Sequence, residues 1–290
     1  EFTAPTVVDK RVLGRLRKYS KLAPLHNPPN IAGIESCMAL APRARNVAVF
    51  DTGFYHGLPE HAYMYALPWE MYAKHRIRKY GFHGISHEYV TREAARQLGK
   101  PYGKVRLVSC HLGSGSSVTA VKDGKAFDTS MGFTPLEGLT MSTRCGDIDP
   151  AIPLYMIREL GMTAGAVDDM LNKKSGLLGV CGYKDLRDAL CAAGYKVPGY
   201  KLARRPGAGV ALRARLAIDM FCYDVARYIG MYVSLLGGVD AIIFTAGVGE
   251  RSDLIRDKIM DLVTIPGAHR TMVVATNEEL MIAKETGKML

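Results

Sequence analysis

The chain has 290 residues, enough to bury a large core as one large domain or two ordinary domains. Hydrophobic residues make up 48%, charged residues 23% and the mean hydropathy is +0.01, and no segment approaches the roughly 18 to 20 uninterrupted apolar residues of a membrane span. The net charge of +10 favours an anionic partner, but the basic cluster over 201–215 lacks interleaved aromatic residues and a nucleic-acid motif, so small polyanions are favoured over nucleic acid or a membrane.

The six cysteines show neither a C-x-x-C pair nor the spacing of a small disulfide framework. The N-terminus has no basic segment followed by an apolar one, as a secretory signal would have. We therefore expect reduced thiols and a cytoplasmic protein.

The first segments are expected to be helical. Residues 9–23 carry apolar side chains at helical spacing, and a second helix is expected over 31–41, with Asn30 as its cap. The turn between them, which contains two prolines, includes His26. A histidine in a turn is more often a structural hydrogen-bonding residue than a ligand.

A short apolar strand is expected over 46–53, with Asp51 near its end. Such an acid lies either at the ligand-binding edge of an α/β sheet or in a helix cap, and local sequence leaves both open. Residues 60–79 are expected to be helical or irregular. His83 follows in a basic, aromatic, glycine-flanked turn before a helix expected over 88–98.

Two glycine-containing turns are candidate phosphate sites. The stretch 105–121 predicts two strands joined by a Gly/Ser turn, whose backbone N–H groups and hydroxyls can face a phosphate. It is neither a Walker loop nor a Rossmann fingerprint, because no G-K-[ST] follows and the strand leads into another strand. Asp123-Gly124, just after the second strand, predicts a further hairpin. A buried strand over 240–246 leads into a second such turn, and Ser252 can cap a helix over 253–262.

The loop over 128–150 is rich in Gly, Thr, Ser and Asp, and its one strong cation is Arg144. It could bind a ligand, with the planar guanidinium of Arg144 recognising phosphate or carboxylate. It could equally be a surface Ω-loop in which its own acids pair with Arg144. Composition leaves both interpretations open.

The rest of the chain alternates helices with shorter segments. Helices are expected over 151–160, 164–171 and 211–236, a basic flexible insertion over 194–210, and a strand over 271–279 with two acids at its tip.

These segments together resemble the acetokinase family, within the acetate and sugar kinase, Hsc70 and actin superfamily. The matching motifs, in the family's order, are A-P-L-H-N-P (23–28), V-F-D-T (49–52), K-Y-G-F-H-G-x-S-H (79–87), H-L-G-x-G-x-S (111–117), D-T-S-M-G-F-T-P-L-E-G-L (128–139), T-R-x-G-D-I-D-P (143–150), L-N-K-K-S-G-L-L-G (171–179), F-T-A-G-x-G-E (244–250) and T-N-E-E-L (276–280).

The resemblance implies an α/β protein with two ribonuclease H-like (actin-like ATPase) domains, each with a mixed five-stranded sheet and helices. Residues 1–52 would be a remnant of the N-terminal domain, joined by a C-terminal helix over 275–290. Residues 53–274 would form the C-terminal nucleotide-binding domain. A homodimer is implied as well.

The implied reaction is reversible Mg²⁺-dependent phosphoryl transfer from ATP to acetate, giving acetyl phosphate and ADP, with Mn²⁺ as a possible substitute metal. By the same resemblance, Arg144 and His83 would stabilise the transition state, Asp51 would be the active-site acid and Glu278 would bind the metal. The residues implied in the acetate pocket are Leu25, His26 and Pro135. The residues implied in binding ATP/ADP are His111, Leu112, Gly113, Ser114, Gly115, Asp185, Leu186, Arg187, Gly247, Val248, Gly249, Glu250 and Arg251.

The sequence also departs from the family pattern. The motif positions place Glu1 just after the family's opening phosphate loop and second substrate-binding arginine, so roughly the first hundred residues of the pattern are expected to be absent. Ser114, Cys145 and Arg251 replace the usual Asn, Ser and Asn. Two alternatives therefore accompany the acetate kinase interpretation: a propionate kinase of the same fold, and a catalytically inactive nucleotide-binding fragment.

Overall fold

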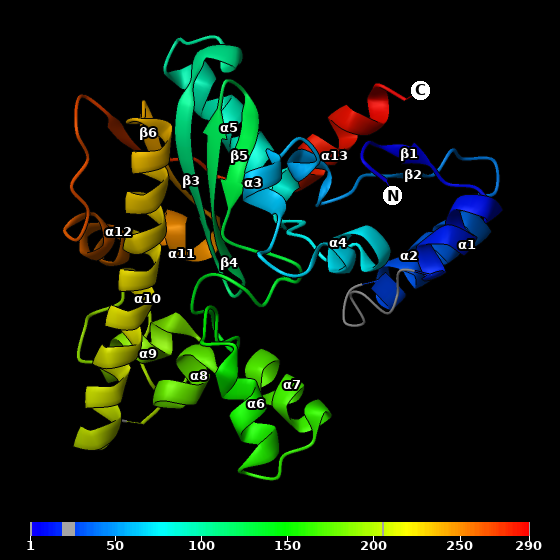
Figure 1. Ribbon diagram of the computed structural model, residues 1–290. Helices are drawn as coiled ribbons and strands as arrows, with labels where there is room; N and C mark the ends of the chain where they lie inside the picture. Colours follow the sequence, from blue (N-terminus) through cyan, green and yellow to red (C-terminus); the bar gives the residue numbers. More distant parts are fainter. Residues whose placement is uncertain (1, 19–26, 205, 290) are drawn as a thin grey trace.

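A five-stranded mixed sheet forms the centre of the computed structural model, which describes residues 2–18, 27–204 and 206–289 (Figure 1). The strands are β3 (Arg106–Leu112), β4 (Ser116–Lys122), β5 (Lys125–Thr129), β6 (Ala241–Thr245) and β7 (Arg270–Val273). Their order is β5-β4-β3-β6-β7, antiparallel from β5 to β3 and parallel from β3 to β7. Short hairpins join the antiparallel strands, whereas the parallel pairs need helical crossovers.

Both predicted hairpins are confirmed. The Gly/Ser turn lies between β3 and β4, and Asp123-Gly124 forms the turn between β4 and β5. Both Asp123 (φ 52°) and Gly124 (φ 76°) have positive φ, the conformation that a two-residue hairpin turn requires and that Asp-Gly adopts readily.

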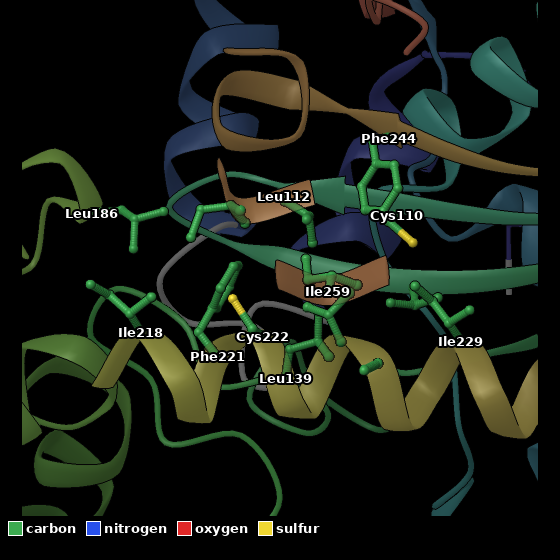
Figure 2. Close-up of a cluster of buried hydrophobic side chains, with 14 of the residues drawn as sticks. Cys110, Leu112, Leu139, Leu186, Ile218, Phe221, Cys222, Ile229, Phe244 and Ile259 are labelled. Carbon is green, nitrogen blue, oxygen red and sulfur yellow. The ribbon is translucent and has the colours of Figure 1, made fainter. Parts of the chain in front are cut away.

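One face of the sheet is covered by the long helix α10 (Ala208–Leu236), which runs along it in Figure 1. Figure 2 shows the apolar side chains between them: Phe221 and Ile229 from the helix approach Cys110 and Leu112 of β3, with Phe244 of β6 alongside. Three shorter helices extend this core: α8 (Gly176–Cys181), α9 (Leu186–Ala192) and α12 (Asp253–Met260).

The opposite face is covered by α5 (Gly84–Gln97), against which α13 (Glu278–Gly287) packs. Its apolar part includes Val90 and Ala94 of α5 with Leu107 of β3 and Ile243 of β6. Strand residues alternate between faces, so β3, β4 and β6 each contribute to both cores.

The N-terminal segment has a small core of its own, on the side of the sheet away from α10 (Figure 1). Strand β1 (Thr6–Val7) pairs antiparallel with β2 (Val47–Ala48), beside helices α1 (Lys10–Lys18) and α2 (Asn27–Leu40). Val8, Leu13 and Ile31 are its buried members.

Several predicted boundaries in this segment were wrong. Helix α2 begins at Asn27 and not after Asn30, because Pro28 and Pro29 fit the first turn, where a missing N–H breaks no intrahelical bond. Helix α1 is described to Lys18, and the rest of the helix predicted over 9–23 lies outside the described residues. The strand predicted over 46–53 is reduced to two residues.

Two other boundaries differ. Helix α5 begins at Gly84, one turn before the predicted start at residue 88, and the strand predicted over 271–279 ends at Val273. The side chain of Asn277 accepts a hydrogen bond from the Leu280 N–H at 2.9 Å and caps α13, so the two acids predicted at a strand tip lie in a helical first turn.

The remaining elements are short. They are η2 (Gly53–Tyr55), α3 (Glu60–Tyr63), α4 (Trp69–His75), η3 (Tyr102–Lys104), α6 (Ala151–Arg158), α7 (Ala164–Lys173) and α11 (Ala246–Arg251). Helices α6 to α9 gather beyond one end of the sheet (Figure 1). None of the helices in the described ranges combines the length and apolar character that a membrane crossing requires. The six cysteines, all within those ranges, form no disulfide.

Candidate active site

The carboxylate of Asp51 lies at the N-terminus of α5. It accepts hydrogen bonds from the backbone N–H groups of His83 (2.6 Å) and Ile85 (3.2 Å), while the Gly84 N–H donates to the Asp51 carbonyl (3.0 Å). A Cβ atom on Gly84 would lie 2.1 Å from that carbonyl, so the close approach requires glycine. Asp51 therefore caps a helix that begins at Gly84, far along the chain, and not the segment directly after it. Burial raises its pKa, an effect that the backbone hydrogen bonds oppose.

Two imidazoles stack next to this helix start. The rings of His83 and His111 have centroids 4.2 Å apart and planes 17° apart. His83 lies in the left-handed region (φ 59°), and its Nδ1 is 2.9 Å from the Ser117 Oγ. His111 Nδ1 is 2.8 Å from the Ser86 Oγ. Burial, and next the nearby His83, lower the pKa of His111 to about 3, so this ring is neutral at pH 7.

Arg144 and His83 converge over the Gly/Ser turn. A Cβ atom on Gly115 would lie 2.8 Å from the Arg144 Nη2 and 3.3 Å from the His83 Nε2. The Arg144 Nη1 donates to the Pro135 carbonyl at 2.7 Å. Among the described residues no carboxylate lies within ion-pair distance of Arg144, and burial lowers its pKa without removing the charge of a guanidinium. A partly buried cation of this kind favours an anion beside Gly115.

The loop over 128–150 is ordered by contacts of its acids with residues other than Arg144. Asp128 pairs with Lys79 (2.7 Å), Glu137 accepts from the Tyr65 hydroxyl, and Asp147 accepts from the Tyr228 hydroxyl (2.7 Å) and the Gly138 N–H (2.8 Å). In addition, Thr140 donates to Asp224 of α10 at 2.6 Å. The interpretation of a surface loop whose acids pair with Arg144 is therefore wrong for the part of the chain that the structure describes.

The turn between β3 and β4 is joined to this loop. Its Gly113 N–H donates to the Gly115 carbonyl (3.0 Å), and the Ser142 N–H donates to the Ser114 carbonyl (3.3 Å). Ser114 is exposed, whereas the side chain of Leu112 is buried in the core against α10. The turn therefore offers backbone groups and a serine hydroxyl to a ligand, and Leu112 contributes only backbone.

The second predicted glycine-containing turn, directly after β6, is coiled into the short helix α11. Ala246 has a positive φ of 63°, and the Glu250 carboxylate accepts from the Ala246 N–H (2.9 Å) and the Thr276 N–H (3.2 Å). Arg256 of α12 donates to the Gly249 carbonyl at 2.8 Å. Glu250 thus holds the turn to the segment before α13, and Gly247 remains exposed.

Glu278 lies in the first turn of α13 and completes an acidic pair with Asp51. Burial raises the pKa of Glu278, and the neighbouring charges of Asp51 and Glu279 raise it further. Among the described residues there is no group of three or more His, Cys, Asp or Glu side chains arranged around one point. Two nearby carboxylates suit Mg²⁺, which is usually bound by one or two carboxylates together with substrate phosphates and water.

A profile of the Acetokinase family matches residues 1–270. The chain belongs to the acetokinase family. It is 46% identical over 308 residues to the acetate kinase of Carboxydothermus hydrogenoformans, covering 99% of this chain and 74% of that protein. It is 47% identical over 314 residues to the acetate kinase of Caldicellulosiruptor bescii, covering 100% and 75%.

Two solved structures share the fold. The acetate kinase of Porphyromonas gingivalis superposes with a TM-score of 0.87 at 37% identity, covering 100% of this chain and 75% of that one. A propionate kinase from Francisella tularensis superposes with a TM-score of 0.88 at 40% identity, covering 98% and 75%. The expected α/β fold of the family is thus confirmed, and this acetokinase chain spans about three quarters of the length of these relatives.

The other predicted site residues of this acetokinase are dispersed. Asp185 caps α9 through the Arg187 N–H (2.9 Å) and pairs with the Arg187 guanidinium, which lies 4.7 Å from the centre of the Tyr200 ring. The side chain of Leu186 is buried in the core, so only its backbone is available to a nucleotide. Leu25 and His26 lie outside the described residues, and Pro135 contacts Arg144 through its carbonyl.

Sequence reasoning missed the buried polar side chains behind the stacked rings of this acetokinase. Ser109 and Ser117 alternate with apolar residues along β3 and β4 and point toward α5, where His87 contacts both. Thr276 contacts Ser86 at 2.8 Å. The available signal was polar residues at every second position of otherwise apolar strands, which is unusual for a strand buried on both faces.

Proposed function

We propose that this acetokinase transfers the γ-phosphoryl group of ATP to acetate, giving acetyl phosphate and ADP, and that the reaction is reversible. The observation that carries the proposal is the convergence of Arg144 and His83 over Gly115, a residue with no side chain of its own. Phosphoryl transfer is mainly positioning and neutralisation of charge, so two donors aimed at one point suit it. The likeness to acetate kinases at 46% and 47% identity supports the same reaction.

In this reaction a carboxylate oxygen of acetate attacks the γ-phosphorus, and the bond between that phosphorus and the ADP oxygen breaks. Arg144 would bind the equatorial oxygens of the moving group, and the His83 Nε2, beside it over Gly115, would contact the same group. The turn over 111–115 and residues 247–251 of α11 would hold the other phosphates through backbone N–H groups. No proton transfer is needed at acetate, because the attacking carboxylate is already ionised.

We further propose Mg²⁺ as the metal, held by Glu278 with Asp51 close by; Mn²⁺ could substitute. When bound, the cation would neutralise charge on the nucleotide phosphates. The charge of Asp51 contributes to raising the pKa of Glu278, and a divalent cation would relieve this repulsion. The backbone N–H groups at the start of α5 that donate hydrogen bonds to Asp51 hold its carboxylate in place.

Propionate kinase is the second candidate, because a structure of that activity matches as well as an acetate kinase does. One additional methylene changes specificity by only about 1 to 3 kcal/mol, so the choice depends on the size of the acyl pocket. An inactive nucleotide-binding fragment is the third.

Trapping of acyl phosphate as hydroxamate separates these candidates. The chain is incubated with ATP, Mg²⁺ and either acetate or propionate. We expect product from both acids and a larger kcat/KM for acetate. A larger value for propionate would establish the second candidate, and no acyl phosphate from any short acid would contradict kinase activity.

We also propose a homodimer that forms through α10. This helix of 29 residues, roughly 43 Å long at 1.5 Å per residue, carries large exposed apolar side chains at helical spacing. They are Leu212, Leu216, Met220, Tyr223, Met231 and Leu235. Light scattering should give twice the mass of the chain, and a Leu216→Glu, Tyr223→Glu double variant should give the monomer mass.

The division into residues 1–52 with 275–290, and residues 53–274, is proposed as well. It is supported by the separate small core of the N-terminal segment. A cavity of about 340 Å³ is lined by Pro5 and Phe50 from that segment and by Met281 and Glu285 from α13. Helix α13 also packs on α5, so it would contact both domains.

A further inference from the structure

A chain of hydrogen-bonding side chains leads from the interior of the protein to His83. The Ser109 Oγ lies 2.9 Å from the His87 Nδ1, the His87 Nε2 lies 2.8 Å from the Ser117 Oγ, and that same oxygen lies 2.9 Å from the His83 Nδ1. The side chains of Ser109, His87 and Ser117 are fully buried. His83 is the member of this chain that faces Gly115 and Arg144.

Counting protons shows that these groups depend on one another. A serine hydroxyl has one proton, and a neutral imidazole has one N–H and one accepting nitrogen. Burial, and next the charges of His111 and His83, lower the pKa of His87 well below its usual value, so this ring is neutral. Ser117 can therefore donate to only one of its two histidine partners, and must accept from the other.

Two directions are compatible with the three hydrogen bonds of this chain. In the first, Ser109 donates to His87, His87 donates from Nε2 to Ser117, and Ser117 donates to the His83 Nδ1, which leaves the His83 proton on Nε2. In the second, all three bonds are reversed, and a neutral His83 presents a lone pair at Nε2. Phosphoryl oxygens only accept hydrogen bonds, so the first direction supplies a donor for them beside Gly115. In the second direction the lone pair on the His83 Nε2 would repel a phosphoryl oxygen, unless His83 gained a second proton next to the cation of Arg144.

We propose that Ser117, oriented by the buried His87, is a positioning residue that holds His83 as the tautomer with its proton on Nε2, directed at the transferred phosphoryl group. This inference rests on the proposed kinase function for its catalytic consequence. The tautomer itself is a property of the resting protein. Preorganised donors aimed at developing charge are the largest contributors to many enzymatic rates, and a donor in a fixed tautomer needs no rearrangement during the reaction.

The kinetic test compares Ser117→Ala with a matched control. Ser117→Ala should lower kcat about tenfold or more, as loss of a supporting residue commonly does. Its KM values for ATP and acetate should stay within about twofold, because only the transition-state contact is lost. Ser117→Thr, which keeps the hydroxyl, should recover most of the lost kcat.

The control is Thr91→Val. The Thr91 hydroxyl is equally buried and bonds to the His87 carbonyl (2.6 Å) and the Tyr102 hydroxyl (3.0 Å), outside the Ser109–His87–Ser117–His83 chain. The Thr91→Val variant should lower the melting temperature as Ser117→Ala does and leave kcat unchanged. Equal losses of kcat in Thr91→Val and Ser117→Ala would assign Ser117 a purely structural role and overturn the proposal.

The direct test is ¹⁵N NMR of the full chain labelled at histidine, with the His83 signals assigned by their loss in His83→Gln. We expect a protonated Nε2 and an unprotonated Nδ1 for His83 at neutral pH, and a mixture of tautomers in Ser117→Ala. Protonation of Nδ1 in the unsubstituted chain would overturn the proposal. Because this measurement needs no turnover, it reads the tautomer even if the chain forms no acyl phosphate, an outcome that would contradict only the proposed function.

Discussion

The two faces of the central sheet use the same strands for different purposes. Toward α10, β3 presents Val108, Cys110 and Leu112, and every position meets another apolar side chain. Toward α5, the next residues along the same strand include Ser109 and His111, which contact buried histidine and serine side chains. The first face is an apolar core, and the second becomes a hydrogen-bonded array as it approaches the candidate site.

The difference shows that alternate residues of one strand can serve two purposes, with one set stabilising the core and the other forming the candidate site. An apolar core tolerates changes that preserve volume, whereas each polar group buried without water needs a partner and a fixed orientation. The α10 face can therefore be altered with an effect on stability alone. Changes on the α5 face should alter function or the response to pH.

The largest stability effect is expected on the apolar face. Phe221→Ala removes a side chain that is only 2% exposed and should lower the free energy of unfolding by about 3 to 5 kcal/mol, because a cavity remains. Urea denaturation measures this. Leu160→Ala, at a position 60% exposed, is the control and should change it by less than about 0.5 kcal/mol. At a temperature where Phe221→Ala remains folded, its kcat should match that of the unsubstituted chain, and a large loss would show that the two faces are not separable.

The largest effect on activity is expected from a change to Arg144, beside the polar face. Arg144→Ala should lower kcat by a factor of about 100 to 1,000, because a transition-state donor is lost, with little change in unfolding free energy. Arg144→Lys should recover only part of the loss, since an ammonium group lacks the planar pair of donors. Arg227→Ala, at an exposed ion pair on α10, is the control. Turnover of Arg144→Ala within about twofold of the unsubstituted chain would contradict the role given to this residue.

A smaller effect is expected in the pH dependence of stability. The pKa of His111 falls from 6.5 to about 3 on folding, so between these values the unfolded chain binds more protons than the folded one. Stability from this group is therefore present above about pH 6.5 and is lost as the pH falls toward 3, at up to about 1.4 kcal/mol per pH unit. The raised pKa values of Asp51 and Glu278 act in the opposite direction, so the effect must be read as a difference between two proteins.

The measurement is urea denaturation between pH 7 and pH 4 for the unsubstituted chain and for His111→Gln. The variant should lose less stability on acidification. If the free energy of unfolding fell equally with pH in both proteins, the neutral state of the buried His111 ring would not contribute to acid sensitivity.

The sequence predicted the elements whose signals are local. The β3–β4 hairpin followed from alternation around a Gly/Ser turn, and the Asp-Gly turn that follows it required only two residues. The possible roles of Arg144 could be stated from its loop, but not decided, because the partners of the loop's acids, such as Tyr228 of α10, are distant in the chain.

Features that depend on distant contacts could not be predicted in this way. Asp51 was recognised as either a site residue or a cap, but its bond to the backbone at the start of that helix spans 32 positions of the chain. Ser109 and Ser117 looked like ordinary strand residues, since only the position of His87 gives them a role. The two prolines in the first turn of α2 suggested a break, because local sequence does not distinguish the first turn of a helix from a turn before it.

The bond between Ser86 and Thr276 joins residues 190 positions apart and has a consequence for the order of assembly. Most of the sheet and α10 can form before residues after 273 are available, because the strand pairs β3–β4 and β4–β5 are close in sequence. The long-range closure must then bring Thr276 and Glu278 against α5. A newly synthesised chain would therefore hold a nearly complete core before it could assemble its acidic pair, so acquisition of activity would lag behind compaction and depend on the docking of α13.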